Sequence, residues 1–393
     1  MGRLKFSFQT TVRACFAGYA VQAVVNNFVP LLFLTFERSY GVPLSKITLL
    51  ITFNFGIQLL VDLLSAKFVD KIGYRVCITA AHVLSAAGLV LLPVLPHILP
   101  PFAGILLAVS VYAVGGGLLE VLVSPILESC PAENHETAMS LLHSFYCWGH
   151  VGVVLLSTVF FHFFGTENWP VLSLIWAVLP AVNALVFLKT PLAPPVPAHV
   201  QKIPLPALLK NRTFWLLSLM MVCAGAGELS VSQWSSAFAE QGLGVGKTVG
   251  DLAGPMFFAV LMGLSRTLYG KYGAKIKLDR FMLVCCAGLL ASYLLITLSP
   301  YPVVSLLGCG LTGLSVGIMW PGTFSKAAAT LRGGGTAMFA LLALFGDLGA
   351  AGGPTLVGIV ADRSGSLQTG VLAAIVFPAV MMLCLFGRRK KHA

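Results

Sequence analysis

The chain has 393 residues, of which 57% are hydrophobic and only 10% are charged, and its formal net charge is +11. An ordinary soluble domain carries roughly 25% charged residues, so this composition excludes a soluble globular protein and makes lipid the expected solvent. The cations lie in short gaps between apolar runs rather than on a soluble basic face, which excludes a nucleic-acid partner as their explanation.

Twelve apolar runs follow one another along the chain, each of about 20 residues or more and therefore long enough to cross a bilayer as a helix. A proline-rich segment with several lysines separates the sixth run from the seventh, and prolines there forbid a continuous helix. The sequence therefore predicts an all-α membrane protein of two six-helix bundles, residues 1–188 and 212–393, joined by a cytoplasmic linker at 189–211. The runs begin near residues 12, 46, 76, 101, 138 and 170, and then near 213, 249, 281, 302, 336 and 368.

The distribution of lysine and arginine predicts the orientation of these spans. With the N-terminus inside, the inner loops hold the basic stretches 67–75, 271–280 and 388–391, whereas the outer loops hold only Arg38, Lys46, Lys247 and Arg363. Cytoplasmic loops of membrane proteins carry the excess of positive charge. We therefore expect both termini in the cytoplasm. We further expect a monomeric, multi-pass protein of a bacterial inner (plasma) membrane.

The two halves also repeat at an offset of 200 residues. The segment LSAKFVDKIGYRV (64–76) aligns with LSRTLYGKYGAKI (264–276) without a gap. The tripeptide Thr-Ala-Met at Thr137 recurs at Thr336, an offset of 199. Two parallel repeats with a substrate site between them are typical of secondary transporters. Three further positions, Gly117, Phe145 and Gly149, pair with Gly317, Phe345 and Gly349 at the offset of 200.

Residues 66–75, AKFVDKIGYR, resemble the loop signature between helices 2 and 3 of the major facilitator superfamily. Within it, GGGLLEVLVSP (115–125), GAGELSVSQW (225–234) and VGIMWPGTFS (316–325) resemble segments of the fucose–galactose–glucose:proton symporter family, whose span 1 carries an Asn pair like Asn26–Asn27. The resemblance implies alternating access and proton coupling through Glu120. The acidic residue that follows the Asn pair in the fucose carrier is Pro30 here.

Carboxyl groups within apolar runs are the candidates for proton coupling, because an ionised group in hydrocarbon costs about 2.5–3.5 kcal/mol or more. Glu120 has no Lys or Arg within a helical turn, and Glu228 lies in a polar run after two glycines. Asp347 lies among glycines, which favours a packing role. For each, the alternative is a protonated carboxyl that holds two helices together by a hydrogen bond. The proton-coupling candidates are Glu120, Glu228 and Asp347.

A second group of charged residues belongs to the repeated loops and is expected to form a cytoplasmic gate. Asp70 can form a salt bridge near a helix end, and Gly73 permits a tight turn. Asp62 lies about two helical turns before Asp70 on the same face, with Lys67 or Arg266 as its expected partner. The gate residues are Asp62, Asp70, Lys71, Gly73, Arg75, Arg266 and Lys271.

Amides, histidines and aromatic rings within the spans are the candidates for binding a solute. Amides both donate and accept hydrogen bonds, which suits hydroxyl-rich solutes, and aromatic rings can stack on a sugar. The alternative for each residue is hydrogen bonding or packing between helices. The substrate-binding candidates are Gln22, Asn26, Asn27, Asn54, Gln58, His143, Tyr146, His150, Gln233, Trp234, Trp320 and Phe345.

The sequence thus predicts a transporter that moves a small polar solute, a sugar or related polyol, with protons and without a cofactor. The alternative is a proton-driven antiporter or exporter of amphipathic compounds or organic anions. Nothing indicates an enzyme or a metal site, since the nine cysteines lack CxxC spacing and the eight histidines are scattered. The segment GLGVGKT (242–248) mimics a phosphate-binding loop but lacks its first glycine, because residue 241 is Gln.

Overall fold

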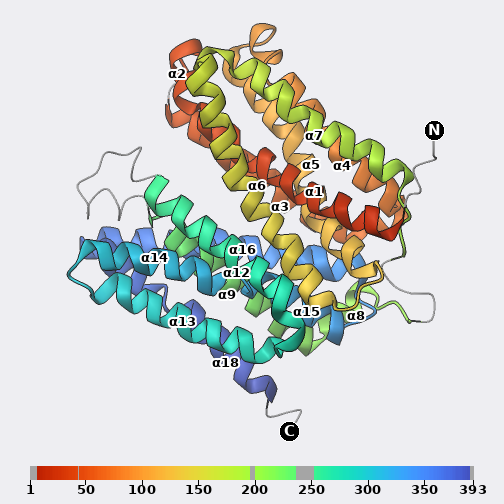
Figure 1. Ribbon diagram of the computed structural model, residues 1–393, viewed down its shortest axis with the longest axis vertical. Helices are drawn as coiled ribbons and strands as arrows, with labels where there is room; N and C mark the ends of the chain where they lie inside the picture. The colour runs from red at the N-terminus through yellow and green to blue at the C-terminus, as the bar shows by residue number, and fades with distance from the viewer. Residues whose placement is uncertain (1–6, 43, 195–199, 236–251, 390–393) are drawn as a thin grey trace. The chain divides into compact units, whose positions relative to one another are not determined.

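A computed structural model describes residues 7–42, 44–194, 200–235 and 252–389 (Figure 1). All regular structure in these ranges is helical, as expected where lipid leaves no water to satisfy exposed backbone groups. Part of the linker and the whole GLGVGKT segment lie outside these ranges. The first helices are α1 (Phe8–Asn27), α2 (Phe33–Tyr40), α3 (Leu44–Ile72), α4 (Tyr74–Leu91), α5 (Pro101–Ser129), α6 (His135–Phe164) and α7 (Trp169–Lys189).

The later helices complete the expected count of twelve spans. Eleven helical segments among the described residues are long and apolar enough to cross a membrane, and α12 occupies the place of the eighth span. The eighth span was expected to begin near residue 249, and α12 begins at Phe257. The first helix, expected near residue 12, begins at Phe8. The helices are α8 (Leu205–Lys210), α9 (Arg212–Ser232), α12 (Phe257–Tyr272), α13 (Leu278–Leu298), α14 (Pro302–Val316), α15 (Met319–Thr330), α16 (Gly335–Ser364), α17 (Leu367–Ala373) and α18 (Val376–Arg389).

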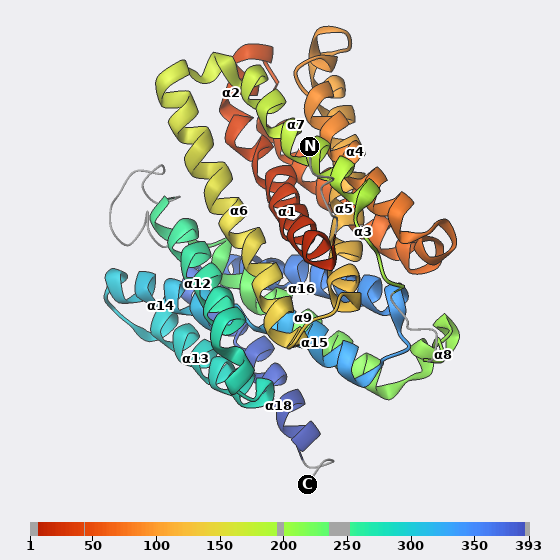
Figure 2. The same ribbon diagram turned by 45° about the vertical axis from the view of Figure 1, so that its right-hand side comes forward.

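The chain forms two compact units, and two long helices, α6 and α16, are each divided between them. Unit 1 contains residues 1–131, 148–202 and 335–340, and unit 2 contains 132–147, 203–334 and 341–393. The start of α6 therefore belongs to unit 2, and the start of α16 to unit 1. Within unit 1, α4 packs along α5, and within unit 2, α13 packs along α14 (Figures 1 and 2). The bundle limits at 188 and 212 stay a prediction.

Glycines of the 200-residue repeat occupy matching packing positions in the two units. A Cβ atom added at Gly117 on α5 would lie 3.0 Å from Val61 on α3. One added at Gly317, which directly follows α14, would lie 3.0 Å from Ser265 on α12. Such contacts are tighter than ordinary van der Waals packing, so a side chain at either position would force the helices apart. The repeat therefore holds in helix packing as well as in sequence.

The second glycine pair of the repeat shows the same correspondence. A Cβ atom at Gly149 on α6 would lie 2.9 Å from Ala23 on α1, and one at Gly349 on α16 would lie 2.1 Å from the carbonyl oxygen of Val222 on α9. The α9–α16 contact is the closer one, because a Cβ atom at Gly225 would also lie 2.1 Å from the carbonyl oxygen of Gly346. These two helices of unit 2 meet backbone to backbone.

We predict that Gly349→Ala lowers the stability of the protein, because its methyl group would overlap the Val222 carbonyl. Overpacking of this kind costs about 1–3 kcal/mol. Thermal unfolding of the detergent-purified protein measures the effect. Gly352→Ala is the matched control on the same helix, since a Cβ atom there meets nothing within 4 Å. Equal unfolding temperatures for the two variants would show that the α9–α16 contact does not require glycine.

Candidate functional site

A network of amide side chains lies inside unit 1 and includes the carboxyl group of Glu120. Gln22 Nε2 donates to Glu120 Oε2 at 2.9 Å, which joins α1 to α5. One turn further along α1, Asn26 Oδ1 accepts from Asn54 Nδ2 at 3.2 Å and from Gln58 Nε2 at 2.7 Å. The i, i+4 spacing on both α1 and α3 places each amide pair on one helix face. Five of the residues expected from the sequence are therefore brought together.

Three amide oxygens of this network are buried and accept no hydrogen bond from the described residues. They are Gln22 Oε1, Asn54 Oδ1 and Gln58 Oε1, and the exposed fraction of each of these residues is at most 5%. A buried acceptor without a donor costs about 1–3 kcal/mol. The network therefore offers acceptor positions to any ligand that brings O–H or N–H groups.

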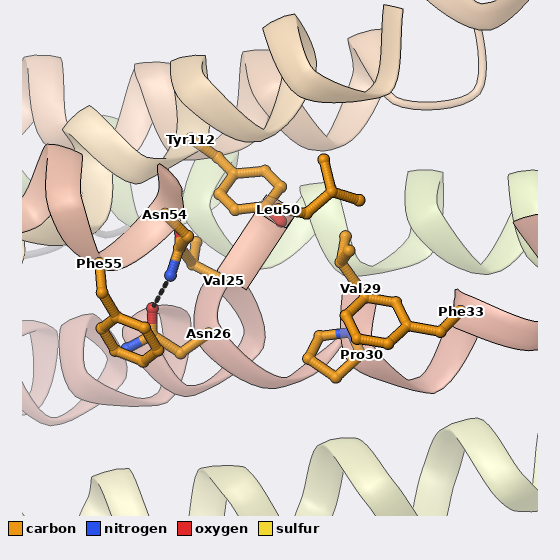
Figure 3. A pocket seen from close by; sticks show the side chains of 9 residues that line it. All are labelled: Val25, Asn26, Val29, Pro30, Phe33, Leu50, Asn54, Phe55 and Tyr112. Atoms are coloured by element: carbon orange, nitrogen blue, oxygen red, sulfur yellow. Dashed lines mark hydrogen bonds between the residues drawn. The ribbon is translucent and has the colours of Figure 1, made fainter. Parts of the chain in front are cut away.

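A small cavity adjoins the same network. Its volume of about 20 Å³ is close to what one water molecule needs. Figure 3 shows the Asn54–Asn26 hydrogen bond at one end of the cavity and Pro30 with Phe33 at the other. Pro30, which follows the Asn pair of α1, is thus part of the cavity wall. The remaining lining residues are Val25, Val29, Leu50, Phe55 and Tyr112.

Asp70, which the sequence predicts to belong to a gate, contacts a residue that was not among the gate candidates. Asp70 Oδ1 accepts a hydrogen bond from Thr336 Oγ1 at 2.6 Å, and its other oxygen pairs with Lys202. The Tyr74 hydroxyl also hydrogen-bonds to Thr336. Thr336 begins the second Thr-Ala-Met copy, so the repeat carried a signal that could have identified it. Gly73 next to this cluster has a φ of 98°, which favours glycine.

Arg75 holds the end of α7 rather than another charged side chain of the gate. Its guanidinium donates to the carbonyl oxygens of Phe187, Leu188 and Thr190 at 2.7, 2.9 and 2.9 Å. A cation is favourable there because the last carbonyl groups of a helix lack partners and carry partial negative charge. Of the other three basic residues of the expected gate, Lys71 and Lys271 are exposed and Arg266 is buried.

Arg266 is the centre of a polar cluster in unit 2. Its side chain is only 5% exposed, and Nη2 lies 3.4 Å from Glu228 Oε2 on α9. Nε donates to the carbonyl oxygen of Gly317 at 2.9 Å. Nη1 reaches α6, where it lies 3.3 Å from the carbonyl oxygen of His143 and 3.1 Å from Cys147 Sγ. A buried guanidinium in a membrane helix needs such partners, because it cannot lose its charge.

The structure thus pairs residues that the sequence placed in different groups. Arg266 was expected in the gate and Glu228 in proton coupling, yet the two form an ion pair. Cys147 was not among the candidates, although its position one turn after His143 on α6 is the signal that could have found it. Ser140 on the same helix donates to the backbone oxygen of Arg266 at 2.8 Å. Asp62 lies in the other unit and is fully buried on α3.

The remaining candidates lie at separate places. Asn27 Nδ2 donates to the carbonyl oxygen of Ala23 in its own helix at 2.8 Å. Trp320 packs its ring on Gly346 and meets Phe324 edge-on, and Phe345 packs against Trp215 with ring centroids 5.6 Å apart. Tyr146, His150, Trp234 and Asp347 are partly exposed, and Gln233 is exposed.

Comparisons with known proteins identify the family and the fold. The family model described as Major Facilitator Superfamily matches residues 14–354. The Escherichia coli fucose:proton symporter has a similar structure, with a TM-score of 0.81 at 16% identity, over 97% of this chain and 99% of that chain. A search of curated proteins found no match.

Two other solved structures show the same fold. A proton:xylose symporter bound to 6-bromo-6-deoxy-D-glucose matches with a TM-score of 0.81 at 11% identity, over 98% of this chain and 95% of that chain. The human organic anion transporter MFSD10 matches with a TM-score of 0.73 at 16% identity, over 96% of this chain and 99% of that chain.

We predict that Asn26→Ala destabilises the protein more than Asn27→Ala does. The first change leaves Asn54 Nδ2 and Gln58 Nε2 without their shared acceptor, at about 1–3 kcal/mol for each buried donor. The second removes only a bond from a side chain to its own helix. Thermal unfolding in detergent compares the two variants. A larger loss for Asn27→Ala would mean that the network does not support unit 1.

Proposed function

The chain belongs to the major facilitator superfamily, and from this membership we propose that it is a proton-coupled secondary transporter of a small polar solute. The solute is a sugar or related polyol, moved by alternating access. Glu120 is the principal proton-coupling group, with Glu228 and Asp347 as further candidates. The proposal includes a monomer in a bacterial inner membrane, with both termini cytoplasmic and with bundles at 1–188 and 212–393.

The hydrogen bond between Gln22 and Glu120 is the observation that carries this proposal. When Glu120 is ionised, it accepts from Gln22 Nε2 at 2.9 Å. When it takes up a proton, its O–H group needs an acceptor, and Gln22 Oε1 accepts no hydrogen bond from the described residues. A half-turn of the amide presents that oxygen to the protonated carboxyl, because the two ends of an amide differ only in donor and acceptor character. One side chain can therefore support both protonation states.

The rest of the amide network supports the choice of solute. Asn54 and Gln58 each donate a hydrogen bond to Asn26, and their own side-chain oxygens are buried acceptors. A solute with several hydroxyl groups supplies matching donors, and a site built for hydroxyl groups rejects analogues that lack them. The structural neighbours include symporters of protons with fucose and with xylose, which fits such a solute.

The proposal also includes the roles that the sequence predicts for the other candidate residues. Histidines and aromatic residues of α6, α9, α15 and α16 contribute hydrogen bonds and stacking faces to the solute, and the Asp70 cluster acts as a gate. Nothing in transport by alternating access calls for covalent chemistry, so the proposal contains no catalytic residue.

Glu120→Gln is expected to abolish the accumulation of sugar driven by an inward proton gradient, because the amide cannot load a proton. Exchange of labelled for unlabelled sugar across the membrane should persist, since it needs no net proton movement. Reconstituted proteoliposomes allow both measurements. Glu133→Gln is the matched control, because it removes the same charge from an exposed residue after α5. Gradient-driven accumulation that survives in Glu120→Gln would contradict the assignment of Glu120.

A second candidate function is proton-driven antiport of organic anions or amphipathic compounds. The buried cation Arg266 favours it, since a guanidinium can bind a carboxylate in bidentate fashion. A structural neighbour transports organic anions, which is consistent with this candidate.

A panel of sugars, polyols and organic anions separates the two candidates by thermal unfolding. We expect a polyol to raise the unfolding temperature of the unmodified protein, because a ligand that binds only the folded state stabilises it. The shift should be lost in Gln58→Leu, which removes a buried acceptor oxygen. Stabilisation by organic anions alone, lost in Arg266→Lys, would instead support antiport.

A further inference from the structure

Arg266 connects a carboxyl group on one helix to the backbone of another. Its Nη2 atom faces Glu228 on α9, while Nη1 faces the His143 carbonyl oxygen and Cys147 Sγ on α6. The guanidinium is a rigid planar group, so a rotation that moves Nη2 away from Glu228 also moves Nη1. The α9 carboxyl and the α6 backbone are therefore linked mechanically through one side chain.

The part of α6 that Arg266 holds ends where this helix passes from one unit to the other. Residues 132–147 of the chain belong to unit 2, and the helix continues from Trp148 as part of unit 1. Cys147 is the last residue on the unit 2 side. A second hydrogen bond, from Ser140 Oγ to the Arg266 carbonyl oxygen, fixes the same segment to α12 at 2.8 Å.

Glu228 is surrounded by helices that carry other titratable or charged groups. Tyr293 on α13 donates to the carbonyl oxygen of Gly227 at 3.0 Å, and α16 packs against Gly225 on the same helix as Glu228. Arg266 is the cation whose nitrogen lies within hydrogen-bond range of the Glu228 carboxylate. The titratable or charged groups on the helices around it include Arg266 on α12, His143 and Cys147 on α6, Tyr293, Cys285 and Cys286 on α13, Cys309 on α14, Lys326 on α15, Asp347 on α16 and Cys384 on α18.

We propose that Glu228 and Arg266 form a second proton-linked switch, in which Arg266 transmits the protonation of Glu228 to α6. While Glu228 is ionised, its charge orients the guanidinium, and Nη1 stays on the His143 carbonyl and Cys147. When Glu228 takes up a proton, the attraction weakens and the guanidinium turns, which releases α6 at Cys147. Arg266 is then a positioning residue, and the switch adds a second coupling site to the transporter proposed above, on which it rests.

The Cys147 thiol is a built-in reporter of this contact. It is 1% exposed, and Cys286 on α13 of the same unit is fully buried and lies beside Met319. Two single-cysteine proteins, each retaining one of these thiols, are labelled with N-ethylmaleimide in proteoliposomes without a solute. Falling pH lowers the thiolate fraction of any thiol, so the ratio of the Cys147 rate to the Cys286 rate removes that common effect.

We expect this ratio to rise roughly fivefold or more as the pH falls from about 8 to about 5, since linked sites commonly couple by factors of about 5–150. In Glu228→Gln, which has nearly the same shape, the ratio should stay at its high value at every pH. Glu228→Asp should retain a pH response. Arg266→Lys keeps the charge but lacks the planar fork, so the response should be lost, and the double variant should match it.

A ratio that does not change with pH in the unmodified protein would overturn the proposal, and so would a pH response that persists in Glu228→Gln. Because no solute is present, the labelling result is independent of the transport measurements. If Glu120→Gln uncouples transport while the ratio is flat, the switch fails and the proposed function stands. If the ratio responds to pH while no proton-driven accumulation occurs, the proposed function fails and the switch at Glu228 stands.

Discussion

Polar groups inside a lipid-embedded bundle have to find their partners within the chain, because hydrocarbon supplies neither donors nor acceptors. In unit 1 this constraint gathers amides and a carboxyl group around Asn26, and in unit 2 it gathers backbone oxygens, a thiol and a carboxylate around Arg266. The two solutions differ in their chemistry. The first can exchange hydrogen bonds without changing charge, whereas the second is fixed by a permanent cation. Unit 1 therefore holds neutral amides that can exchange hydrogen bonds, and unit 2 holds a buried cation with a carboxylate beside it.

The same constraint governs the loops that join the spans. Arg75 satisfies the last carbonyl groups of α7, and Asp70 receives hydrogen bonds from the start of α16. Arg75 therefore completes a helix terminus elsewhere in unit 1, and Asp70 binds a side chain in the first turn of another helix. Charged residues near the ends of spans therefore hold the ends of helices that are distant in sequence.

The spans and the family could be predicted from the sequence, because hydropathy, the lysine and arginine distribution and the repeat are local or periodic properties. Both predictions are confirmed. The partners inside the clusters could not be predicted, since Gln22 and Glu120 are 98 residues apart and Asp70 and Thr336 are 266 apart. Backbone acceptors cannot be predicted from residue type, because every residue carries the same carbonyl group. Arg266, for example, donates to the backbone carbonyl oxygen of Gly317, a residue without a polar side chain.

The matching glycine contacts also record how the chain was duplicated. Gly117 and Gly149 pack as Gly317 and Gly349 do, each pair separated by the same offset along the chain. The intervening stretch, which includes a helix end, a loop and a helix start, must therefore have kept its net length in both halves since the duplication. An insertion in one copy would have needed a compensating deletion before the next glycine. Between these contacts the register shifts by one residue and returns, because Thr-Ala-Met at Thr137 recurs at Thr336, whereas both glycine pairs keep the offset of 200.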